Sequence, residues 1–180
     1  MKMKLPTLVI AATALLMSYP EPVKAVGSIT VNGKWAGTAF ASAIDLNADG
    51  IAARTFDVRA YDQFPFIALQ GVADTGLVAL PGQGSCSDPN ALELEPYGKV
   101  TFRGYRGDAI FTTVDSSVHL CYNPANPDEL MHLTITGGTG IYAGRTGSGT
   151  VRLHDIVLEA TPEGFPLVVD TQGEFSLTIQ

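Results

Sequence analysis

Positive charge, cysteine and helical patterning are all scarce in this sequence. Its 180 residues include 11 Lys and Arg against 18 Asp and Glu, which gives a formal net charge of −7. Phosphate backbones repel an acidic chain, so no nucleic-acid partner is expected, and docking on anionic lipid is disfavoured. After residue 17 no apolar run approaches the roughly 20 residues that a membrane-spanning helix needs, so no membrane span is expected in the mature chain.

The first 25 residues have the pattern of an export signal. Two lysines precede an apolar run over residues 5–17, and Val23-Lys24-Ala25 fits a cleavage site. The run is short for an uncleaved membrane anchor, which is the alternative interpretation. The sequence therefore predicts a signal peptide over residues 1–25 and one domain over residues 26–180, secreted or periplasmic.

The chain has only two cysteines, Cys86 and Cys121. In an exported protein an even number of cysteines indicates a disulfide. Such a bridge would stabilise the fold by about 3–4 kcal/mol on the chain-entropy account. Two free thiols, or one reactive cysteine, are the alternatives, but neither residue sits in a recognisable catalytic motif.

Beyond the signal peptide, no segment keeps apolar residues at helical spacing for three turns. Strand patterns recur instead, separated by Gly, Pro, Asn and Asp. An all-β fold is therefore predicted, as a single antiparallel, roughly eight-stranded β-barrel with a β-sandwich as the competing architecture. A barrel of this size is filled by side chains or holds one small ligand. The expected strands cover residues 29–43, 54–61, 66–80, 92–105, 109–120, 130–136, 150–160 and 167–179.

Six glycines lie within residues 137–149, between two expected strands. A phosphate-binding loop is excluded because the glycine spacing does not fit such a loop, no helix is expected after the segment, and the lysine of a P-loop is missing. Glycines that permit a tight turn and bent strands are the better interpretation.

This segment carries a family resemblance. Residues 133–144 and 147–151 resemble the glycine-rich segment of allene oxide cyclase and dirigent proteins. The first half is similar, more loosely, to bacterial exported proteins assigned to the same barrel class. The resemblance implies a small antiparallel β-barrel. In plant members the barrel binds apolar or phenolic intermediates and controls their cyclisation or coupling, but the resemblance assigns no catalytic residue here.

A possible calcium loop precedes the second expected strand. Asp45, Asn47 and Asp49 provide oxygen ligands at alternating positions, and Gly50 permits a sharp turn. An EF-hand is rejected because Phe56 stands where its bidentate Glu is required. A looser Ca²⁺ site remains open, against a turn in which the Asp and Asn side chains bond their own backbone.

Few other residues suggest a site. Arg103, His132 and Tyr142 are candidate ligand-binding residues, if they face the barrel interior. Glu93 and Glu95 share a strand face and could act as acid and base if buried, although an exposed acidic face is favoured. The three histidines form no close metal-binding pattern.

Two functional classes follow. The favoured one is a non-enzymatic exported barrel that binds a small apolar molecule or has an envelope or secreted accessory role. The other is a cyclase or dirigent-like enzyme whose cavity positions a reactive intermediate. Beside these two classes, a calcium-stabilised surface module is a further alternative. A large apolar cavity containing Arg103, His132 or a carboxylate would favour the enzyme, whereas an interior packed solid with Phe, Leu and Val would exclude both ligand hypotheses.

Overall fold

The structure is a computed structural model that describes residues 27–50, 52–61, 65–123, 125, 128–162 and 166–180. The expected signal peptide lies outside these residues. Apart from one turn of 3-10 helix, the described regular structure is entirely β. Its elements are β1 (Ile29–Ala41), β2 (Arg54–Tyr61), β3 (Phe66–Ala79), β4 (Leu92–Gly104), β5 (Ala109–Val114), β6 (Leu120–Tyr122), β7 (Asp128–Thr139), η1 (Gly140–Tyr142), β8 (Gly147–Ala160) and β9 (Pro166–Ile179).

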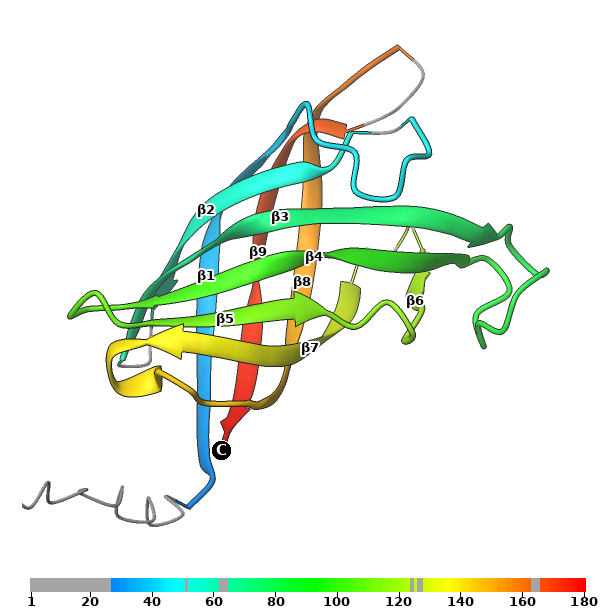
Figure 1. The fold of residues 1–180 in the computed structure, drawn as a ribbon. Coiled ribbons are helices and arrows are strands. Elements are labelled where there is room, and N and C mark those ends of the chain that lie inside the picture. Colours follow the sequence, from blue (N-terminus) through cyan, green and yellow to red (C-terminus); the bar gives the residue numbers. More distant parts are fainter. Residues whose placement is uncertain (1–26, 51, 62–64, 124, 126–127, 163–165) are drawn as a thin grey trace, which may run out of the picture.

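The strands close into a barrel. Hydrogen bonding joins eight of them antiparallel in the order β3-β2-β1-β9-β8-β7-β5-β4, and a further pairing of β3 with β4 completes the ring. In Figure 1, β3, β4, β5 and β7 run across the view while β1, β8 and β9 run at a steep angle to them. The predicted barrel is confirmed and the sandwich alternative is wrong. No helix in the described part of the chain is long and apolar enough to cross a membrane.

The ninth strand, β6, pairs with the projecting end of the β3–β4 hairpin, which with its connecting loop is called the tongue. Residues 92–94 of β4 pair with β6, further along the same edge of β4 that pairs with β5. Figure 1 shows the ends of β3 and β4 projecting with β6 beside them. Cys86, in the loop between β3 and β4, is bonded to Cys121 of β6 with the two Cα atoms 5.6 Å apart. The predicted disulfide is confirmed, and it ties the tongue to β6.

One expected strand is in fact two. The sequence predicts a continuous strand over residues 109–120, but β5 ends at Val114 and β6 begins at Leu120. The side chain of Asp115 accepts hydrogen bonds from the backbone N–H of Ser117 (3.1 Å) and from its hydroxyl (2.6 Å). Asp and Ser favour turns because their side chains bond nearby backbone groups in this way. The Asp115 turn therefore interrupts the extended chain.

The glycine-rich segment is a bulged strand end, a turn and a strand start. Gly137, with φ of 155°, adjoins a register shift in the β5–β7 pairing. At the start of β8, Gly147 has φ of 146°, and a Cβ there would lie 2.0 Å from the carbonyl oxygen of Thr178. Only glycine permits this backbone conformation and this close approach of β8 to β9.

Aromatic side chains fill one end of the barrel. Phe66, Phe102 and Phe175 point inward from three strands, and Tyr142 of η1 packs on Phe66. Their ring centroids are 5.2–6.1 Å apart in tilted and edge-on arrangements. Aromatic pairs favour this geometry, which leaves this end closed by solid packing.

Candidate functional site: an apolar cavity beneath buried ionisable groups

Towards the other end, the barrel interior contains a small cavity of about 50 Å³. Because inward positions alternate along every strand, several strands contribute to its wall. Most of the wall is apolar, while Arg54, Asp155 and Thr171 supply polar groups. Its main apolar side chains are Trp35, Val58, Leu69, Met131, Leu133 and Val151.

Arg54 and Asp155 form an ion pair on this inner wall. Arg54 is the first residue of β2, and its Nη1 lies 3.1 Å from Oδ2 of Asp155 on β8. Thr171, the register partner of Asp155 on β9, donates its hydroxyl to the other carboxylate oxygen. The Arg54 and Asp155 side chains are only 23% and 11% exposed, so they are screened less than a surface pair. Each charge on this wall therefore has a partner of opposite sign.

Glu129 lies one inward position beyond Met131 on β7. It continues the buried series at residues 131, 133 and 135, and its register partner on β8 is Leu153, which packs against the core. Only 6% of the residue is exposed, and its Oε2 has no hydrogen-bond partner among the described residues. Burial raises the pKa of Glu129 to about 7, which Arg54 opposes and Asp155 reinforces. Glu129 is thus a buried carboxyl group that can exchange its proton near neutral pH.

Trp35 provides the second buried group without a partner. It is 4% exposed on β1, and its Nε1 has no hydrogen-bond acceptor within the described part of the chain. Gly173 stands opposite it on β9, where a Cβ would come within 3.0 Å of the Trp35 ring. Among the described residues, Trp35 Nε1 and Glu129 Oε2 are the two buried side-chain atoms without a partner. Buried polar atoms are normally hydrogen-bonded. Trp35 lines the cavity, and Glu129 adjoins it through two lining residues, Met131 on the same strand face and Leu153 on β8.

Tyr122, on β6, belongs to the same electrostatic environment. Burial raises the pKa of its phenol, as does the nearby charge of Glu129, while Arg54 lowers it. The short strand that carries the disulfide therefore also brings a hydroxyl group to the ionisable end of the barrel.

The candidate residues named from the sequence do not line this cavity. Arg103 is exposed on β4, where its Nη1 donates to Gln70 at 2.9 Å. His132 lies on β7 between the inward residues Met131 and Leu133 and lines a groove beside Asp115 on the outer surface. Tyr142 is buried at the aromatic end. The structure does not bring these three side chains together.

The side chains of the proposed calcium ligands Asp45 and Asn47 accept hydrogen bonds from the backbone of their own turn. Asp45 accepts hydrogen bonds from the N–H groups of Ala48 (2.6 Å) and Gly50 (2.9 Å), and Asn47 accepts one from Asp49 (3.2 Å). Ala48 and Gly50 both have positive φ, as Asx-rich turns require. In the described ranges no three His, Cys, Asp or Glu side chains gather closely enough to hold a metal ion. Calcium binding stays a prediction.

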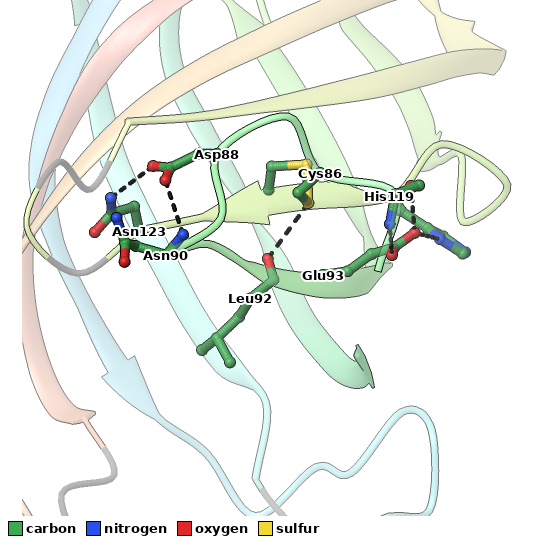
Figure 2. The surroundings of a disulfide bond; sticks show 9 residues. Cys86, Asp88, Asn90, Leu92, Glu93, His119 and Asn123 are labelled. Atoms are coloured by element: carbon green, nitrogen blue, oxygen red, sulfur yellow. Dashed lines mark hydrogen bonds and ion pairs between the residues drawn. A yellow bond between two sulfur atoms is a disulfide. The ribbon is translucent and has the colours of Figure 1, made fainter. Parts of the chain in front are cut away.

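Glu93 is buried, contrary to the favoured interpretation of an exposed acidic face. The loop before β4 covers it, and its carboxylate accepts from the Ser85 N–H (2.7 Å) and hydroxyl (2.8 Å). His119 Nδ1 lies 2.8 Å from Glu93 Oε1 (Figure 2). His119, and then Ser85, lower the pKa of Glu93 to about 2. Because Ser85 adjoins Cys86, this cluster secures the same loop as the disulfide.

Replacing Glu93 with glutamine should lower the melting temperature at pH 6 but much less at pH 2. A carboxyl whose folded pKa is depressed stabilises the fold above its unfolded pKa of 4.5, and this contribution is lost as pH falls towards 2. Thermal unfolding of both proteins at pH 6, 4 and 2 measures the effect. An equal loss at every pH would mean that the carboxylate charge is irrelevant; Glu95→Gln, on the same strand, is the matched control.

The residues around the cavity were missed because the sequence shows them as isolated charges. The expected strand over residues 130–136 stops one residue short of Glu129, yet extending its alternation backwards places Glu129 with Met131 on the inner face. The same alternation places Arg54 with Phe56 and Val58. An inward charge on an otherwise apolar strand face was the available signal.

No protein-family model matches the chain, and no curated protein matches it. One similar solved structure is that of the pterocarpan synthase dirigent protein GePTS1, at 12% identity and a TM-score of 0.27 over 84% of this chain and 85% of that one. A likeness at that level assigns neither family nor function.

Proposed function

We propose that this protein is a non-enzymatic barrel that binds a small, mostly apolar molecule. The supporting observation is the apolar cavity, which Trp35 lines. Trp35 Nε1 and Glu129 Oε2 are buried without a hydrogen-bond partner among the described residues, and Glu129 is the register partner of the lining residue Leu153. Binding pockets commonly combine an apolar wall with a few polar groups that orient the ligand. An otherwise packed interior has no structural need to leave those two atoms unpaired.

The cavity size limits the ligand. At about 50 Å³ it is well below the roughly 150 Å³ of an engineered protein cavity that holds benzene. A short aliphatic chain is therefore the expected occupant. Met131, which is unbranched and adaptable, is the wall residue best able to yield to a larger one.

We also infer kinship with the allene oxide cyclase and dirigent barrels, together with export. The glycine-rich segment and the closed antiparallel barrel support the kinship. The Cys86–Cys121 bridge supports an oxidising compartment, since disulfides persist there. The export pattern over residues 1–25 agrees with that placement.

Trp35 allows a direct test, because it is the only tryptophan and lines the cavity. Adding n-butanol should change its fluorescence saturably. Ala39→Leu, which fills the cavity, should abolish the response, while Val151→Ala, which enlarges it, should strengthen binding. Ile135→Val, at the packed end, is the matched core control. A linear, non-saturating response in both the parent protein and Val151→Ala would refute binding in the cavity.

A second candidate function is steering of a reactive intermediate. The observation that favours it is Glu129, whose pKa of about 7 suits a general acid or base, close to the Arg54–Asp155 pair. Native mass spectrometry of protein purified from its own host would identify a retained ligand. Conversion of that compound by the parent protein but not by Glu129→Gln would establish the enzyme; recovery of the unchanged compound would leave binding alone.

A further inference from the structure

Among the described residues, the ionisable group around Glu129 has one cation, Arg54, and two carboxyl groups, Asp155 and Glu129. Arg54 is already engaged by Asp155 at 3.1 Å, and Asp155 is completed by the Thr171 hydroxyl. Glu129, 6% exposed, has no such partner in the described part of the chain. Arg54, which lowers the pKa of Glu129, is shared with Asp155. A buried carboxylate is costly unless it is paired and hydrogen-bonded, so a cationic ligand would complement Glu129.

We propose that the cavity takes a short aliphatic amine in its protonated form, with the ammonium group on Glu129 and the alkyl chain against the apolar wall. This inference rests on the proposed binding function and names its ligand class. The ammonium would supply the N–H donor that Oε2 lacks, and a charge-assisted bond of this kind is stronger than a neutral one. The alkyl chain would pack against Met131 and Val151, which line the cavity.

Trp35 suits the same ligand. Indole is the aromatic ring that attracts a cation most strongly, and Trp35 lines the cavity. The net charge of the chain, −7, would also favour the approach of cations over anions. A carboxylic acid ligand would instead bring a second unpaired negative charge beside Glu129, since the Arg54 guanidinium is already paired.

Binding should be linked to the protonation of Glu129. The charged groups that face it are Arg54 from β2 and Asp155 from β8, with the Tyr122 phenol from β6. An alkylammonium stays protonated below about pH 10, as a lysine side chain does. A cation binds the ionised carboxylate, so affinity should rise as pH increases through 7 and level off above it, with a proton released on binding at lower pH.

The test compares three compounds of equal length: n-butylamine, n-butanol and butyrate. Trp35 fluorescence and isothermal calorimetry are measured at pH 5.5 and pH 8. At pH 8 butylamine should bind roughly tenfold to a hundredfold more tightly than butanol, as expected for a hydrogen bond to a charged group. Butyrate should not bind. The preference for amine over alcohol should shrink at pH 5.5.

Glu129→Gln should remove the preference for amine over alcohol and its pH dependence. The matched control is Glu174→Gln, whose parent side chain is 63% exposed on the outer surface, and it should retain both. If butanol binds as tightly as butylamine, the amine inference fails while the binding function stands. If butyrate binds best, Arg54 governs the site and the inference is overturned. If none of the three binds, both proposals fall.

Discussion

Glu129→Gln should raise the free energy of unfolding by about 3 kcal/mol at pH 8 and leave it nearly unchanged at pH 4. The carboxyl has a pKa of about 7 in the fold against 4.5 as a free side chain. Below pH 4.5 the carboxyl is protonated in both states. Between pH 4.5 and 7 the unfolded chain ionises more readily, so the wild type loses stability, at about 1.4 kcal/mol for each unit of pKa difference. Glutamine has nearly the same shape and cannot ionise.

Urea unfolding of the two proteins at pH 4, 6 and 8 measures this difference. Glu174→Gln, on the outer surface, controls for the loss of one negative charge from the whole molecule. A constant difference across the three pH values would show that Glu129 titrates normally. Burial would then not dominate its environment, and the case for an unpaired charge beside the cavity would be lost.

Removing the disulfide should cost about 4 kcal/mol. The bridge joins residues 35 positions apart, and closing a loop of that length restricts the unfolded chain by this amount on the chain-entropy account. The double variant Cys86→Ser with Cys121→Ser should therefore unfold at a lower urea concentration. The barrel ladder itself contains neither cysteine, so circular dichroism of the variant should keep its β-sheet spectrum.

A reductant should produce the same loss in the parent protein and no change in the double variant. If reduction left the unfolding midpoint of the parent unaltered, the bridge would contribute nothing to global stability. The tongue would then unfold separately from the barrel, and hydrogen exchange confined to residues 80–91 would show it.

Most of the strands could be predicted because side-chain alternation and turn residues are local signals. In β7, Met131, Leu133 and Ile135 alternate with polar neighbours and mark an inner face. The prediction of a single strand over residues 109–120 was wrong because the residue types there favour extended structure throughout. The Asp115 side chain turns the chain there, and Asp115 N–H bonds the carbonyl of His132 on β7. That contact depends on a partner distant in sequence.

The site was harder to predict than the fold. Glu129 and Asp155 lie on the consecutive strands β7 and β8, whereas Arg54 lies on β2, far away along the chain, and the barrel fold brings the three together. A single charged residue on a strand is most often solvent-exposed, so none of them stood out. Burial of Glu93 was missed for a related reason: a separate loop, held by the disulfide, covers the outer face of its strand.

The two ends of the barrel interior differ in how densely they are packed. Packed aromatic rings around Phe102 fill one end, whereas the other end combines a cavity with the Arg54–Asp155 ion pair and the buried Glu129 carboxyl group. Local opening costs least where packing is sparse. Under the proposed binding function, the ligand would therefore enter and leave through local opening at the ionisable end, while the aromatic end stays packed.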